Sequence, residues 1–347
     1  MSQNIKIIQR SLESSKTFDQ NFAHLGPKIL HEKQLEGLIP ASLLPTVINY
    51  AQCMQSNFWL AEVEGKLVGR IGANILPSHP EQGGVGFFLL DRCHPQAIEV
   101  SQSLIASACQ WLKSRNARIA YGPIDLHTWF PYRYPLPQQE CNTSFDWEPK
   151  DPDLYIELWQ QAGFQPALSF ISQAHAALEQ LYQHTAAAVP KLESLGYRFT
   201  LKEMTNLDKN DFRMVYQLSM DGFRDNPLFE PIPEEFFINL YQSRGKAPRH
   251  GRIVIATDKN NQAVSFFFGF ADGEYVVLKS VATAKKHRGL GLNNACCHLF
   301  LRKYLEEGFT KNITALIRQG NATESFNRKG SYLWTREYVL LSKNLEK

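Results

Sequence analysis

Apolar and polar residues alternate over short runs in the first half of the chain, and Glu64-Gly65 separates the first two of these runs as a turn. Later in this half, the stretch EVSQSLIASACQWLK places apolar residues at helical spacing. Together these patterns predict a hairpin, a third strand, a helix, a fourth strand and a late helix, at residues 58–63, 66–73, 85–90, 99–113, 117–123 and 154–161.

The second half repeats this order. Its patterns predict three strands, a helix and a further strand, at residues 253–257, 263–270, 275–283, 293–307 and 312–317. A helix that crosses over between strands is typical of a mixed α/β sheet. We therefore predict an α/β (α+β mixed sheet) fold of two tandem copies, each a central mixed sheet flanked by helices. The stretch HAALEQLYQHTAAAVPKL reads as a connecting helix, so we expect domains at residues 1–180 and 190–347.

Composition narrows the class of protein. The chain has 347 residues, of which 44% are hydrophobic and 20% charged, and its net charge of +3 is too small to indicate nucleic-acid binding. The first residues lack the pattern of a secretory signal, and no apolar run reaches the roughly 18 residues that span a bilayer. Six cysteines show no metal-ligand spacing, and adjacent Cys296 and Cys297 fit a buried helix face. We expect a cytoplasmic protein without metal, membrane or nucleic-acid partner.

One junction combines glycine with positive charge. The stretch KKHRGLGLNN, residues 285–294, lies between an apolar strand pattern and an apolar helix pattern. Glycine lets the backbone approach a phosphate, and the unpaired amides at a helix N-terminus favour anions. Lys285, Lys286 and Arg288 add charge for a pyrophosphate or a ribose phosphate. The alternative is an ordinary strand-to-helix turn with a solvated basic face.

The junction resembles the acetyl-CoA signature of the GNAT superfamily of N-acetyltransferases, which has Gln or Arg first, Gly fourth, and Gly or Ala sixth. Arg288 takes the first position and Gly291 the fourth, whereas Asn293 departs from the pattern at the sixth. The resemblance implies acetyl-CoA as cosubstrate, with backbone amides of residues 289–294 on its pyrophosphate. It implies these cofactor-binding residues: Val281, Ala282, Thr283, Arg288, Gly289, Leu290, Gly291, Leu292, Asn293, Asn294, Asn321 and Ser325.

The first half lacks this signature. Its corresponding junction reads LLDRCHPQAIEVSQSL, with a proline and acids in place of the glycines. The stretch LWQQAGF, residues 158–164, nevertheless resembles the late helix of the same family, with Trp159 in the place of a tyrosine. We interpret the first half as a degenerate copy that kept the fold and lost the cofactor.

Acetyl transfer to an amine needs a base for the amine and an acid for the leaving thiolate. Family members often carry the base as a glutamate on the strand before the signature, but in this chain that position falls near Val277. We therefore predict Glu274, at the start of the same strand, as the base. A role in a turn is the alternative for Glu274. The family's tyrosine position falls on Phe326. Tyr332 is therefore the predicted acid, and a packing role is the alternative.

The acceptor is expected to be a small-molecule or peptide amine, and two segments are predicted to shape its site. Residues 221–230 carry acids, which a solvated loop also explains, and residues 121–134 are rich in aromatics, which packing between the copies also explains. His127 in the second segment reads as a structural histidine. The competing functions are a non-catalytic acyl-CoA or metabolite-binding protein, an aminoacyl transferase of the Fem type, and a structural pair of domains. The sequence leaves the oligomeric state open.

Overall fold

The computed structural model describes residues 4–10, 47, 50–51, 54–137, 144–150, 153–245, 251–320 and 332–346. By compactness the chain divides into two units. Unit 1 comprises Met1–Gln139, Trp147–Ser169 and Glu337–Lys347, and unit 2 comprises Glu140–Asp146 and Phe170–Arg336. The expected domain boundary at 180–190 thus falls inside unit 2, and the last residues of the chain belong to unit 1.

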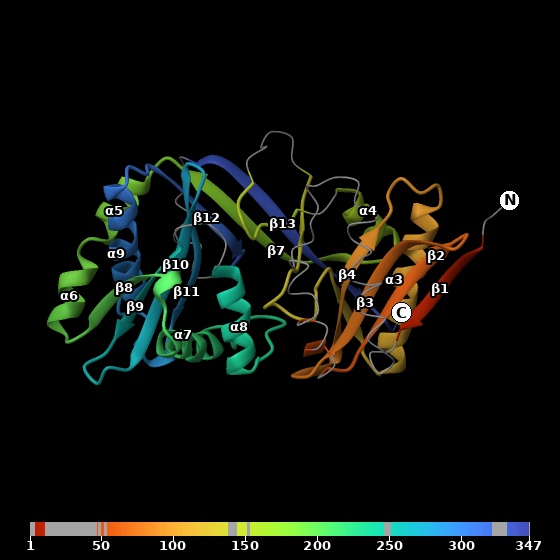
Figure 1. Ribbon diagram of the computed structural model, residues 1–347, viewed down its shortest axis with the longest axis horizontal. Coiled ribbons are helices and arrows are strands. Elements are labelled where there is room, and N and C mark those ends of the chain that lie inside the picture. Colours follow the sequence, from red (N-terminus) through yellow and green to blue (C-terminus); the bar gives the residue numbers. More distant parts are fainter. Residues whose placement is uncertain are drawn as a thin grey trace. The chain divides into compact units, whose positions relative to one another are not determined.

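Unit 1 is a mixed sheet whose strands follow the order β1-β2-β3-β4-β5-β13, and β1 to β4 can be followed in Figure 1. Only β4 and β5 pair in parallel among these neighbours. Short β6 also pairs with β13. The strands are β1 Ile5–Arg10, β2 Ser56–Val63, β3 Lys66–Leu76, β4 His79–Leu90, β5 Ile119–Gly122, β6 Tyr134–Pro135 and β13 Tyr332–Asn344.

Two helices of unit 1 confirm the predicted pattern. Helix α3, Ala97–Ser114, buries Val100, Leu104 and Ala108 against one face of the sheet, as apolar spacing of four residues requires. Helix α4, Asp153–Gln161, is followed by Gly163, whose φ of 89° lets the chain turn back. Trp159 on α4 is fully buried, because its ring packs against Phe164 and Tyr134.

Unit 2 has the strand order β13-β7-β12-β11-β10-β9-β8, in which β11 and β12 are the parallel pair. Only the first residues of β13, up to Arg336, belong to unit 2. There Gln173 Nε2 of β7 donates to Thr335 Oγ1 of β13 at 3.2 Å. The other strands are β7 Gln165–His175, β8 Arg198–Glu203, β9 Gly251–Thr257, β10 Ala263–Asp272, β11 Tyr275–Thr283 and β12 Lys311–Arg318. Both units therefore share one architecture, and the predicted fold of tandem mixed α/β copies is confirmed.

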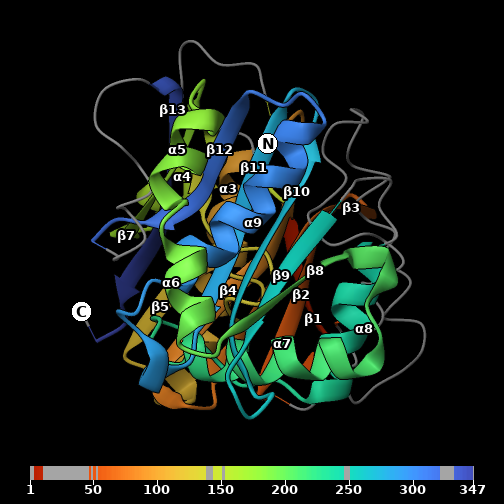
Figure 2. The ribbon, with the colours of Figure 1, turned by 90° about the vertical axis from the view of Figure 1, so that its left-hand side faces the viewer.

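Helices cover both faces of the sheet in unit 2. Helix α9, Leu292–Glu306, lies with α5, Leu178–Thr185, in front of the strands in Figure 2. Helix α6, Ala188–Ser194, packs beside α9. Helix α7, Lys209–Gly222, packs against β10 and β11, and α8, Glu234–Gly245, packs on α7.

The structure corrects the sequence-based elements at one place. The predicted connecting helix over HAALEQLYQHTAAAVPKL begins instead with the end of β7 and continues as two short helices, α5 and α6. Strands β1, β6, β7, β8 and β13 were also not predicted from the sequence. In β7 and β13 the apolar residues do not alternate with polar ones over the whole strand. None of the helices in the described residues is long and apolar enough to cross a membrane.

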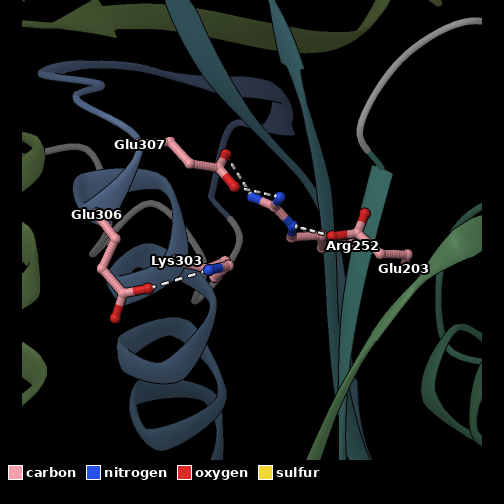
Figure 3. A network of polar contacts seen from close by, with 5 residues as sticks. All are labelled: Glu203, Arg252, Lys303, Glu306 and Glu307. Atoms are coloured by element: carbon pink, nitrogen blue, oxygen red, sulfur yellow. Dashed lines mark hydrogen bonds and ion pairs between the residues drawn. The ribbon is translucent and has the colours of Figure 1, made fainter.

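A buried arginine connects strands β8 and β9, at one edge of the sheet in unit 2, with the end of α9 (Figure 3). Arg252 of β9 donates to Glu203 of β8 at 2.6 Å and to both carboxylate oxygens of Glu307, at 2.6 and 2.9 Å. Its guanidinium also lies 4.4 Å from the ring centroid of Tyr304. One side chain thus joins the edge strand, its neighbour and the end of α9.

Candidate functional site

The segment between β11 and α9 has the backbone of an anion-binding loop. After a single 3-10 turn over Lys285–His287, the chain passes through Gly289 and Gly291 with φ values of 80° and 95°. Such angles favour glycine. A Cβ added at either residue would meet no atom within 4 Å, so the space beside this backbone is open.

Helix α9 begins without a side-chain cap. Its N-cap is Gly291, and the first helical amide bonded to a carbonyl is that of Ala295, which donates to Gly291 O at 3.1 Å. The amides before it have no partner within the helix, as at every helix N-terminus. Because an anion satisfies such amides and interacts favourably with the helix dipole, this turn can hold a phosphate.

Positive charge surrounds the loop, with two acids beside it. Lys285, Lys286 and Arg288 are exposed. The Arg288 Nε donates to Thr283 O at 3.2 Å, and its guanidinium is 4.0 Å from Asp225 Oδ2. Asp221 Oδ2 accepts from the Lys285 amide at 3.2 Å. The predicted acidic segment 221–230 therefore begins next to the loop of residues 285–294, which we call the phosphate loop for its predicted role, and Glu230 at the end of the segment is buried.

Asn293, which departs from the family signature, has a structural reason to be there. Its Oδ1 accepts from Thr283 Oγ1 at 2.5 Å and from Ser265 Oγ at 3.4 Å, and the two hydroxyls lie 2.8 Å apart. Ser265 is fully buried. The side chain thus fastens the first turn of α9 to β10 and β11. A glycine or alanine at this position cannot make these bonds.

We expect Asn293→Ala to loosen this connection. Removing the acceptor of the Thr283 hydroxyl should lower the free energy of unfolding by about 1 kcal/mol, whereas the Ser265 hydroxyl keeps Ala282 O as an acceptor at 3.0 Å. Urea unfolding measures this effect. Asn293→Asp keeps an acceptor oxygen and should retain the stability, so an equal loss in both variants would contradict this role for Asn293.

The parallel ladder between β11 and β12 stops halfway. Pairing runs from Tyr275 opposite Lys311 to Leu278 opposite Thr314, although β11 continues to Thr283 and β12 to Arg318. At the same row β11 carries a bulge. Phe268 pairs with Ser280 and Gly269 with Leu278, so Lys279 is an extra residue. The last part of β11, which contains the predicted cofactor-binding residues Val281, Ala282 and Thr283, therefore lies beyond the pairing with β12.

The three predicted cofactor-binding residues of β11 differ in what they contact. Val281 packs against the apolar cluster under α9. Ala282 faces the other side of the sheet, where a Cβ on Gly222 of α7 would lie 2.7 Å from its Cβ. Thr283 joins the Asn293 network. The structure thus brings the predicted residues 281–283 and 288–294 together at one end of β11.

The two predicted catalytic residues lie elsewhere. Glu274 precedes β11 and pairs with Lys311 at 2.7 Å. Glu274 lies five positions before the bulge at Lys279, about 16 Å at the usual rise of a strand. Tyr332 begins β13 and is 53% exposed, and Trp334 two residues later packs against Tyr275 at the same end of β11. Asn321 and Ser325, like Phe326, lie outside the described residues.

In unit 1 a loop of the chain lies beside the end of β4, at the position that corresponds to the last part of β11 in unit 2. Pairing of β4 with β5 ends at Gly84 opposite Tyr121, and the following loop packs against β4. A Cβ on Gly86 would lie 2.2 Å from Ile124 O, so the loop backbone touches the strand. Asp125 Oδ1 accepts from the Phe87 amide at 2.5 Å. The aromatic segment 121–134 therefore packs into unit 1 itself.

His127 in this segment is a buried histidine, as the sequence suggested. It is 0% exposed, its Nε2 lies 3.2 Å from Tyr50 Oη, and its ring packs on Phe130 at 4.9 Å. Burial lowers the pKa of His127 from 6.5 to about 3. The imidazole is therefore neutral in the folded protein over the physiological range.

This histidine should make the protein sensitive to acid. Since the unfolded state binds the proton more tightly, the stabilisation is complete above pH 6.5 and is lost as the pH falls toward 3. We expect the free energy of unfolding to fall by about 2 kcal/mol more between pH 6.5 and 4.5 in the unaltered protein than in His127→Gln. Denaturant unfolding across this range tests it. Equal slopes in the unaltered protein and in His127→Gln would contradict this role for His127.

No family profile and no curated protein sequence matches the chain. Solved structures do match its fold. One is a tandem GNAT protein from the clavulanic acid biosynthesis pathway, with 12% identity, a TM-score of 0.55 and coverage of 99% of both chains. Another, from Enterococcus faecalis, is described as a probable N-acyltransferase and has 7% identity and a TM-score of 0.60, over 99% of this chain and 73% of that one. A GNAT from Kribbella flavida has 6% identity and a TM-score of 0.55, over 98% and 71%. The chain thus has the tandem GNAT fold.

Proposed function

We propose that the protein is an acetyl-CoA-dependent N-acyltransferase whose unit 2 binds the cofactor. The observation that carries this proposal is the loop of residues 288–294, in which two left-handed glycines lead into an uncapped helix N-terminus. Because the loop directly follows a strand edge that has left its parallel ladder, one ligand can contact both. A long arm ending in phosphates, such as that of an acyl-CoA, fits this combination.

In this proposal the amides of residues 289–294 bind the pyrophosphate, and Lys285, Lys286 and Arg288 add charge, including for the 3′-phosphate. The edge at Val281–Thr283 pairs with the pantetheine arm, and Asn321 and Ser325 contact the same arm. These roles are assigned by resemblance and by position on β11.

The reaction proceeds by direct attack in a ternary complex. The amine nitrogen attacks the thioester carbonyl, the tetrahedral intermediate expels the thiolate, and the nitrogen loses a proton while the thiolate gains one. A backbone amide of β11 stabilises the oxyanion. The assignment of Glu274 as base and Tyr332 as acid stays a prediction.

The relatives in fold support acyl transfer as the general reaction. One of them is described as a probable N-acyltransferase and another as a GNAT from a biosynthetic pathway. The acceptor in our proposal is a small-molecule or peptide amine, and the protein acts in the cytoplasm.

A second candidate function is a non-catalytic acyl-CoA-binding protein. The observation that favours it is the position of Glu274 and Tyr332, of which the first is paired with Lys311 and the second is exposed. Both functions share the cofactor site and differ in turnover.

Thiol release distinguishes the two. The purified protein is incubated with acetyl-CoA and a panel of primary amines, and free CoA is measured against a blank without amine. Amine-dependent release supports the transferase. Binding of acetyl-CoA without release for any amine, including peptide N-termini, contradicts the transferase and supports the binding protein.

A further inference from the structure

One residue near the end of the β11–β12 ladder has an unusual backbone. Leu316 of β12 has a φ of 58°, in the left-handed region that bulky side chains rarely adopt. It is not in a turn, because β12 continues to Arg318. Left-handed leucines persist only where surrounding contacts hold them, and such strain gathers at functional sites.

The contact that holds Leu316 comes from the neighbouring strand. Thr314 pairs with Gln173 and Ile317 with Ile171, so β12 has one residue more than β7 across this step, which is a bulge. The Leu316 amide donates to Ser172 Oγ at 2.8 Å. Ser172 is fully buried.

This bulge lies in the same row as the bulge in β11. The last parallel pair is Leu278 with Thr314, and the extra residues follow it directly on both strands, at Lys279 and at Ala315–Leu316. Because a bulge bends its strand, two bulges in one row direct the two strands apart. The Ser172 hydroxyl therefore supports the divergence from the β12 side.

We propose that Ser172 is a positioning residue for the acyl-CoA arm. This inference rests on the proposed function, in which the arm pairs with the edge of β11 beyond Leu278. By holding Leu316 in its left-handed conformation, Ser172 keeps β12 from resuming its pairing with β11. That edge stays available to the ligand, while the phosphate loop after β11 is unaffected.

Two ligands distinguish binding at the edge of β11 from binding at the phosphate loop. Acetyl-CoA has both the phosphates and the arm, whereas adenosine 3′,5′-bisphosphate has phosphates and no arm. Calorimetric titration of Ser172→Ala should give a Kd for acetyl-CoA at least about tenfold higher, since the left-handed conformation of Leu316 loses the hydroxyl that supports it and β12 can resume its pairing with β11. The Kd for adenosine 3′,5′-bisphosphate should stay within about twofold.

A second substitution tests the conformation itself. Glycine adopts positive φ without strain. Leu316→Gly in the Ser172→Ala background should therefore restore acetyl-CoA affinity to within about threefold of the unaltered protein. This double variant also provides a folded protein if Ser172→Ala alone is insoluble.

The matched control is Thr314→Val. Thr314 is buried and lies two residues before Leu316 in β12. Its hydroxyl donates to Gln173 O at 3.3 Å, at the last pair of β12 and β7 before the bulge. It should change neither Kd. Equal weakening of both ligands in Ser172→Ala, or equal effects of Thr314→Val and Ser172→Ala, would overturn the inference and leave the proposed function intact. If the unaltered protein binds no acetyl-CoA, the proposed function fails and this inference fails with it.

Discussion

Gly291→Asp should weaken acetyl-CoA binding at least about tenfold while the protein remains folded, because it sets a carboxylate beside the proposed pyrophosphate site. Gly291 has a φ of 95°, and its Cβ position opens onto empty space beside the loop. Aspartate tolerates the left-handed region better than most residues, and the strain of a side chain at positive φ is matched in the control variant described next. A negative charge at a helix N-terminus is favourable in the absence of ligand. Calorimetric titration gives the affinity, and thermal unfolding gives the stability.

The control for this variant is Gly308→Asp. Gly308 follows the other end of α9, with a φ of 87° and open space around its Cβ position. It receives the same side chain under the same backbone constraint, at the helix end that disfavours anions. Its acetyl-CoA affinity should match that of the unaltered protein. Equal loss of affinity in the two variants would mean that strain in α9 causes the effect, and the loop would lose its role.

Arg252→Met should lower the stability of unit 2 more than any surface substitution. The guanidinium is 4% exposed and serves two carboxylates, Glu203 and Glu307 (Figure 3). Methionine keeps the packing over Tyr304 and removes the charge. Loss of a buried partner costs about 3–5 kcal/mol, and since the glutamates are 34% and 35% exposed, we expect about 2–3 kcal/mol. The midpoint of urea unfolding measures it.

Lys303→Met is the control on the same helix. Lys303 pairs with Glu306 at 3.2 Å, and the two side chains are 44% and 54% exposed. Exposed pairs of this kind contribute about 0–1 kcal/mol, so we expect little change. If Arg252→Met costs no more than Lys303→Met, the network in Figure 3 is not what holds β8 and β9 to α9.

The sequence predicted the elements around the phosphate loop because local signals determine them. The strand 275–283 is observed with the predicted bounds, and the helix expected at 293–307 is α9 at Leu292–Glu306. A strand pattern, glycines and a helix pattern in succession depend on a few neighbouring residues. The same local signals identified the hairpin and α3 in unit 1.

The rest depends on residues far apart in the chain. The departure at Asn293 is explained only when Thr283 and Ser265 are seen beside it. The conformation of Leu316 depends on Ser172, 144 residues earlier, and the closing of unit 1 depends on the loop at Ile124 touching Gly86. Glu274 was predicted from its strand alone, whereas its partner Lys311 comes from a strand 37 residues later.

The central claim is that unit 2 binds acyl-CoA through its phosphate loop, and calorimetric titration with acetyl-CoA tests it most directly, with dephospho-CoA as the comparison. We predict one site per chain, because the loop of unit 1 packs against its own strand, whereas in unit 2 the pairing of β11 with β12 ends at Leu278. We also predict weaker binding of dephospho-CoA, because Lys285, Lys286 and Arg288 lose the 3′-phosphate. No heat from acetyl-CoA at millimolar concentration would contradict the claim and leave a tandem GNAT fold without its cofactor.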